Sequence, residues 1–121
     1  MRYQNKNIIV MAEICSTGLW RKGKGCICGN MIGYDELDLP EKLIKELKAW
    51  INKYDDAFYK FFLGKVKEID EKLIEKINIE AYRIVIELKK LFPDKNILLY
   101  QENNKGNIEG PLVTSKILPR C

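Results

Sequence analysis

Apolar and polar residues alternate through the middle of the chain with the spacing of amphipathic helices. From Pro40 the apolar positions recur every three to four residues as far as Phe62, and Gly64 is expected to end this helix. Its N-terminus is expected at Pro40, with Asp38 as the candidate cap. Its apolar stripe contains Leu43, Ile44, Leu47, Trp50, Ile51, Tyr54, Phe58, Phe61 and Phe62. Asp55 and Asp56 either restart this helix or continue it.

A second helical pattern runs from Ile69 to Leu91, with a new cap expected at Asn78. Its apolar face comprises Ala81, Ile84, Val85, Leu88 and Leu91. The segment 92–96, which opens with Phe92-Pro93, is typical of a helix stop followed by a turn. Two amphipathic helices are therefore predicted, and a third if a new helix begins at Asp55 or at Asn78.

Two short apolar runs predict strands on either side of the helices. Residues 8–14 and 97–100 are almost continuously apolar, as in strands covered on both faces. A strand, a helical connection and a second strand predict a parallel pair. Between the first strand and the helices lies a glycine-rich segment with Leu19-Trp20 embedded in it, predicted as a turn or hairpin whose second arm is 26–34.

The whole pattern predicts a single domain over residues 1–121 of the α/β class, with α+β as the alternative. We expect a small sheet with at least one parallel strand pair, packed by two to three amphipathic helices. The turn-rich segment 103–107 is consistent with a hairpin partner for the second strand. The sequence leaves the strand order and the structure of residues 101–121 open.

The chain of 121 residues contains no histidine. Histidine is the usual general base near neutral pH and the commonest metal ligand, so Ser-His-Asp and Cys-His catalysis are excluded. The four cysteines lack the paired C-x(2–4)-C spacing of zinc sites and are expected to pack rather than to bind metal; they are Cys15, Cys26, Cys28 and Cys121. No cofactor and no metal site are predicted.

The net charge of +4 does not form a nucleic-acid-binding stripe, because lysines alternate with Glu and Asp along the predicted helices. The basic excess gathers in residues 21–25, and an acidic stretch follows at 35–41. No apolar run approaches the roughly 20 residues that cross a bilayer. We therefore expect a cytoplasmic protein that binds neither nucleic acid nor membrane.

Several segments in order carry a family resemblance. Glu13 to Trp20 is followed by the acidic-Leu segment 35–40 and then by Leu43, Leu47 and Trp50. Asn78 to Ala81 leads into the helix end 87–94 and the strand 97–100. This order resembles small bacterial immunity-type proteins encoded beside polymorphic toxins, including those of contact-dependent growth inhibition. Ala81 stands where a glycine is usual in the family's last helix, and Ile84-Val85 replace Leu-Ala.

The resemblance implies a non-catalytic protein that neutralises a cognate toxin domain by occlusion, as a monomer or weak homodimer. A basic toxin would be met by the acidic residues Asp35, Glu36, Asp38, Asp55 and Asp56. Trp20 is the candidate aromatic anchor, since Trp50 at helical spacing is expected in the core. An acidic toxin would instead use the basic segment 21–24.

Two other classes of function stay open at this stage. A small cytoplasmic enzyme or metal-binding domain would use carboxylates, such as Glu36 with Asp38, or cysteines. A scaffold or oligomerisation module would show an apolar stripe wider than the core requires, and Phe58-Tyr59 with Phe61-Phe62 is where to look for it.

The absence of a predicted metal site makes a direct test possible. Treatment with a chelator is expected to leave the thermal unfolding transition unchanged, because no metal holds the fold. The loss of that transition would support a structural metal site built from the cysteines.

Overall fold

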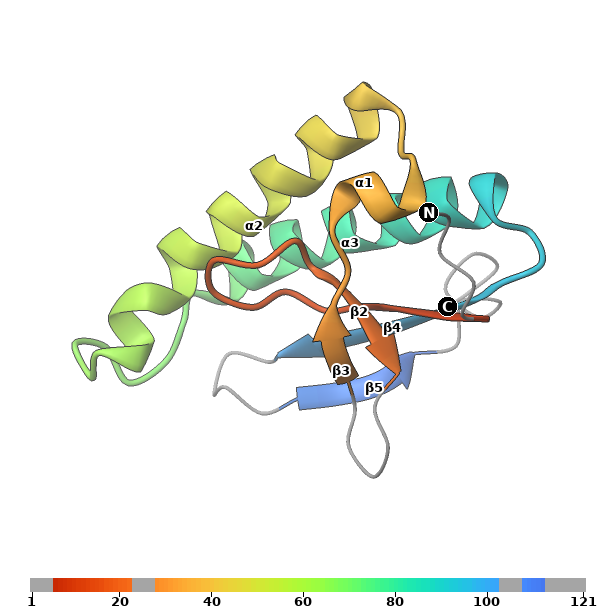
Figure 1. The fold of residues 1–121 in the computed structure, drawn as a ribbon. Coiled ribbons are helices and arrows are strands. Elements are labelled where there is room, and N and C mark those ends of the chain that lie inside the picture. Colours follow the sequence, from red (N-terminus) through yellow and green to blue (C-terminus); the bar gives the residue numbers. More distant parts are fainter. Residues whose placement is uncertain (1–5, 23–27, 103–107, 113–121) are drawn as a thin grey trace.

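The computed structural model describes residues 6–22, 28–102 and 108–112, and these form a two-layer α/β fold (Figure 1). Five strands form one mixed sheet in the order β3-β2-β1-β4-β5. The helices lie together on one face of this sheet. In chain order the elements are β1 (Asn7–Val10), β2 (Leu19–Lys22), β3 (Cys28–Met31), α1 (Tyr34–Leu37), α2 (Glu41–Phe62), α3 (Glu71–Leu91), β4 (Asn96–Glu102) and β5 (Ile108–Leu112).

The predicted parallel pair is confirmed at the centre of the sheet. β1 pairs with β4 in parallel, from Asn7 opposite Asn96 to Val10 opposite Leu99. β2 and β3 extend the sheet from β1 as an antiparallel hairpin, and β5 pairs antiparallel with β4 on the other side. The hairpin predicted for the glycine-rich segment is therefore also confirmed, although Leu19 and Trp20 belong to its first strand rather than to a loop.

The first strand is shorter than predicted. It ends at Val10 instead of Ile14, and residues 11–18 form a loop in which Cys15 and Gly18 have positive φ angles of 56° and 80°. Gly18 has no alternative here, because a Cβ atom at this position would lie 2.4 Å from Cζ3 of Trp50. The loop approaches α2 so closely that only glycine fits.

Both long helices are continuous, which corrects the expectation of a new cap at Asn78. α3 passes through Asn78 without a break, because its cap is Asp70, whose side chain accepts a hydrogen bond from the Lys72 N–H at 3.1 Å. α2 passes through Asp55 and Asp56 and ends at Phe62, followed by Gly64 with a φ of 75°, so the predicted break there is confirmed.

The cap predicted for α2 is also wrong. Pro40 occupies the N-cap position, and Asp38 instead ends the short helix α1 in the left-handed conformation, with a φ of 55°. Aspartate is one of the few residues that adopt this conformation at low cost, which explains its place between two helices. The helix α1 itself was not predicted, because four residues are too few for a periodic pattern.

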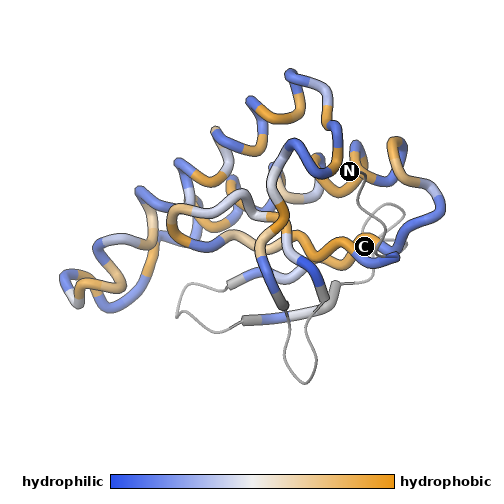
Figure 2. The backbone as a smooth tube through the Cα atoms, viewed as in Figure 1, coloured by the Kyte–Doolittle hydropathy of each residue, from blue (hydrophilic) through white to orange (hydrophobic). Residues whose placement is uncertain are grey.

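The core lies between the helices and one face of the sheet. Ile8, Val10, Ile97 and Leu99 point from the central strands towards α2 and α3, and all four are buried. Figure 2 shows the apolar stretches of both helices alternating with polar ones along their length. Trp50 is only 1% exposed, so its predicted place in the core is confirmed.

The opposite face of the sheet is also apolar at its centre. Because side chains alternate along a strand, Ile9 points away from the helices, and it is fully buried there. Trp20 lies directly across from it on β2, and the Trp20 indole donates a hydrogen bond to the Met11 carbonyl at 2.8 Å. The near-continuous apolarity of β1 thus reflects burial on both faces, as predicted.

The burial of Trp50 gives a stability prediction. Trp50→Ala is expected to lower the free energy of unfolding by about 3–5 kcal/mol, because it empties a large core site. The matched control is Tyr59→Ala on the same helix, where the side chain is 59% exposed; there we expect a loss within about 0.5 kcal/mol. Urea unfolding of both variants measures the difference, and equal losses would contradict this description of the core.

Candidate functional site

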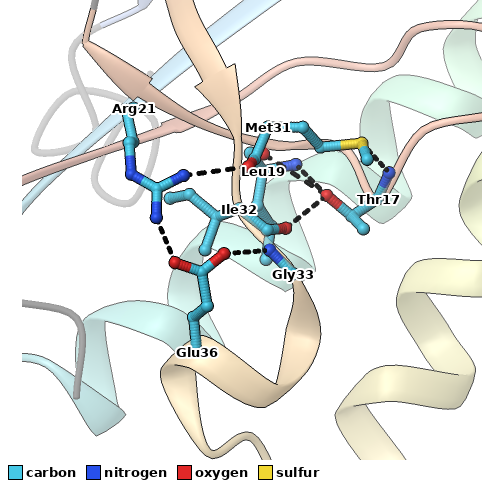
Figure 3. A network of polar contacts seen from close by, with 7 residues as sticks. All are labelled: Thr17, Leu19, Arg21, Met31, Ile32, Gly33 and Glu36. Atoms are coloured by element: carbon cyan, nitrogen blue, oxygen red, sulfur yellow. Dashed lines mark hydrogen bonds and ion pairs between the residues drawn. The ribbon is translucent and has the colours of Figure 1, made fainter. Parts of the chain in front are cut away.

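The short helix α1 is fastened to the β2–β3 hairpin by Glu36. Its carboxylate accepts a hydrogen bond from the Gly33 N–H at 2.8 Å and forms an ion pair with Arg21 on β2. Arg21 also donates to the Met31 carbonyl at 2.9 Å, so one guanidinium joins two strands and a helix (Figure 3). The Gly33 hydrogen bond, together with Arg21, holds the pKa of Glu36 below its usual range.

The loop after β1 joins the same network through Thr17. Its hydroxyl donates to the Ile32 carbonyl at 2.7 Å and accepts from the Leu19 N–H at 3.3 Å (Figure 3). The hydroxyl of Tyr34 on α1 donates to the Thr17 carbonyl at 3.3 Å, and partial burial raises the pKa of Tyr34. Loop 11–18 and α1 therefore form one hydrogen-bonded unit at the side of the sheet.

Asp55 reaches this loop from α2. Its carboxylate accepts a hydrogen bond from the Cys15 N–H at 3.4 Å. Partial burial raises the pKa of Asp55, the Cys15 hydrogen bond opposes this effect, and the neighbouring charge of Asp56 adds to it. Asp55 thus holds the loop while its carboxylate is partly removed from water. The side chain of Asp56, by contrast, is exposed.

The six residues predicted to bind a partner differ in their exposure and in their contacts within the protein. Asp35, Asp38 and Asp56 are exposed, whereas Glu36 and Asp55 are engaged inside the protein. The carboxylates fall into two groups, one at α1 and one on α2, and loop residues 15–17 lie between them. Trp20 belongs to neither group, because it lies on the sheet face away from the helices.

A second surface, which the site prediction did not include, lies where α2 turns into α3. Five large apolar side chains are exposed there; they are Tyr59, Phe62, Leu63, Val66 and Leu73. Three lysines lie among them, at positions 60, 65 and 67. The available signal was the run Phe58-Tyr59 with Phe61-Phe62, named above as the place to look for a stripe wider than a core requires. Phe58 is buried and Phe61 half-buried, whereas the other two are exposed.

Comparison with known families assigns the chain. Residues 6–102 match the model of a family described as Serratia CdiI immunity protein-like, which spans the fold from β1 to the end of β4. The chain belongs to this family. The predicted resemblance to immunity proteins of contact-dependent inhibition is thereby confirmed, and membership supports an immunity function. No curated protein and no solved structure shows significant similarity to it.

One concave surface of this immunity-family chain is a groove between the start of α2 and the end of α3. It has a volume of about 430 Å³ and a partly apolar floor that includes Leu43 and Ile86. Charges of both signs surround the floor; they belong to Lys42, Glu46, Arg83, Glu87 and Lys90. Lys90 pairs with Glu87 at 3.3 Å, and the residues of the groove form no combination of nucleophile and base.

Metal-ligating residues do not gather in the described ranges 6–22, 28–102 and 108–112, where no group of three Cys, Asp or Glu could hold an ion. Cys15 is exposed and forms no disulfide with a described residue. Cys26, Cys121 and the side chain of Cys28 lie outside the described residues, and so does the basic segment 23–25. No helix within the described ranges is long and apolar enough to cross a membrane.

The raised pKa of Asp55 leads to a prediction about pH. The native state holds this proton more tightly than the unfolded state does, so Asp55 favours folding most below about pH 4, the ordinary aspartate range. That contribution is lost as the pH rises through the raised pKa. Asp55→Asn keeps an acceptor for the Cys15 N–H without the charge. We therefore expect this variant to melt at a higher temperature than the parent at pH 7, and at the same temperature as the parent at pH 3.

The matched control is Asp35→Asn, which makes the same change in net charge at an exposed position. It is expected to leave the melting temperature nearly unchanged at both pH values. If Asp55→Asn does not exceed this control at pH 7, partial burial of the Asp55 charge does not cost stability and the assignment is wrong.

Proposed function

We propose that this protein binds the toxin domain encoded beside it and neutralises that domain by covering its active site or another essential surface. The observation that carries the proposal is the family match over residues 6–102, which includes all three helices and four of the five strands. The bound toxin is the protein partner, met in the cytoplasm, and the protein itself performs no reaction.

The chemistry of the described surface supports a binding role. There is no histidine in the chain. Three described carboxylates have shifted pKa values: burial raises the pKa of Glu13, and the other two, Glu36 and Asp55, have contacts within the fold. Glu36 binds Gly33 and Arg21, and Asp55 binds the loop through Cys15. A strongly perturbed group in a cleft is a candidate for catalysis, whereas these two groups are explained by the contacts that hold α1 and the loop.

The carboxylates available to a basic toxin are Asp35 and Asp38 at α1 and Asp56 on α2. All three are exposed and form no ion pair with another described residue. Glu36 and Asp55 contribute indirectly, because their contacts hold α1 and the loop in place beside these exposed charges. Exposed charges of this kind raise the rate of association more than they raise the affinity.

Co-expression tests the proposed function. The toxin-like C-terminal domain of the neighbouring gene is expressed alone and then together with this chain. We expect the domain alone to arrest growth, and the pair to grow and to yield a complex that copurifies. If the domain is toxic and the chain neither rescues growth nor binds, the proposal fails for that pair.

The acidic residues at α1 are tested by the double variant Asp35→Lys/Asp38→Asn. Asparagine is used at position 38 because it tolerates the left-handed conformation found there. If the toxin is basic, the association rate is expected to fall several-fold, with the larger effect at low salt. The matched control, Glu75→Lys/Asp94→Asn, changes the net charge equally at exposed positions elsewhere. Equal rates for the two variants would place the contact elsewhere.

A further inference from the structure

Large apolar side chains are exposed mostly at and beside the turn between α2 and α3. Eight large apolar side chains are exposed among the described residues, and five of them lie between Tyr59 and Leu73. We call this set the hairpin tip; it comprises Tyr59, Phe62, Leu63, Val66 and Leu73 with Lys60, Lys65 and Lys67. In Figure 1 the tip projects past the sheet, so none of the described strands covers it.

The aromatic part of the hairpin tip is fixed in place by the core beneath it. The Phe58 ring is buried and stacks on Tyr54 with centroids 4.2 Å apart. The Phe62 ring lies 5.8 Å from Phe58 and 5.7 Å from Phe61, although Phe62 itself is 49% exposed. A ring held in this way loses little side-chain entropy when a partner covers it, as in the aromatic anchors of protein interfaces.

The backbone of the turn is also well defined. The Gly64 N–H donates to the Phe61 carbonyl at 3.0 Å and the Lys65 N–H donates to the Lys60 carbonyl at 2.9 Å. An ion pair between Lys53 on α2 and Glu80 on α3 joins the two helices below the turn. The apolar side chains of the tip therefore stand on a hydrogen-bonded turn.

The charges of the hairpin tip indicate the chemistry of its occupant. The part of the tip from Tyr59 to Lys67, which holds four of its five apolar side chains, contains three lysines and no carboxylate. The carboxylates Glu68, Asp70 and Glu71 follow it, before Leu73 on α3. None of these lysines forms an ion pair with a described residue. An apolar patch edged by lysines is complemented by an apolar patch edged by Asp and Glu.

We propose that the hairpin tip is a docking surface for the cognate toxin domain, which meets it with an apolar patch edged by carboxylates. This inference rests on the proposed function and adds the surface that carries the affinity. A second copy of the chain fits less well, because a twofold contact between tips would bring six lysines together. An anionic membrane fits less well, because the family match points to a protein partner.

The first test removes apolar surface from the tip. Phe62→Ala/Leu63→Ala is compared with Ile79→Ala/Leu91→Ala, which truncates two side chains of α3 that are 45% and 43% exposed. The toxin domain is purified from the co-expressed complex and its affinity for each chain is measured by calorimetry. We expect the tip variant to bind about tenfold more weakly or worse, and the control to bind within about twofold of the parent.

The second test reverses the charges of the tip. Lys60→Glu/Lys65→Glu is compared with Lys42→Glu/Lys76→Glu, which makes the same change in net charge at other exposed positions. The tip variant is expected to lose more affinity than its control. The melting temperature of each variant is measured first and must equal that of the parent. We expect it to do so, because the substituted side chains are exposed.

The outcomes separate this inference from the proposed function. If the parent chain binds the toxin domain and both tip variants bind as their controls do, the tip proposal is overturned while the proposed function stands. If the parent does not bind the domain at all, both fail for that pair. A parent dimer that Phe62→Ala/Leu63→Ala dissociates, or parent binding to phosphatidylglycerol vesicles that the same variant abolishes, would assign the tip to another occupant and overturn the inference.

Discussion

The parallel pairing of β1 with β4 is the contact on which the arrangement of the other elements depends. It joins residues 7–10 to residues 96–99. Because the two strands run in the same direction, the chain between them must return to the end of the sheet at which β1 begins. The β2–β3 hairpin extends the sheet beside β1, and α2 and α3 make the return across one face. The turn between these helices consequently projects beyond the ends of the central strands, where a partner has access to it.

The same architecture determines which polar groups are available to a partner. Loop 11–18 and α1 are anchored by buried apolar side chains, among them Ala12 and Leu37. They are also held by the hydrogen bonds of Thr17, Glu36 and Asp55. These groups are satisfied inside the protein. Of the acidic residues predicted to bind a partner, Asp35, Asp38 and Asp56 are exposed, and so are the lysines of the hairpin tip. We propose that binding by this immunity-family chain draws on apolar surface at the tip and on exposed charge near α1.

Much of the fold was predictable because it follows from local periodicity. The stripe through Leu47, Trp50 and Tyr54 located α2, and the apolar runs at Ile8 and Ile97 located the parallel pair. The end of β1 was missed because Met11 and Ala12 are apolar and buried although they belong to the loop. Asn78 was misread as a cap because a polar residue in a helix can equally lie half-buried within it.

The binding residues were harder to predict than the fold. Acidic residues close together in sequence were predicted to bind a partner, but two of them have contacts within the protein. Glu36 is held by the Gly33 N–H and by Arg21, and Asp55 accepts a hydrogen bond from the Cys15 N–H. The exposed part of the aromatic run was visible in the sequence as surplus apolar residues. Its separation into buried Phe58 and exposed Phe62 depends on how α2 meets α3, which periodicity alone does not determine.

The central claim is that the chain neutralises its partner by stoichiometric binding and not by a reaction. Calorimetric titration of the chain into the refolded toxin domain, followed by an intact mass measurement of that domain, tests it most directly. The account predicts saturation at equal amounts of the two proteins and an unchanged toxin mass. Absence of binding, or a toxin that is modified by a small fraction of an equivalent of the chain, would contradict it.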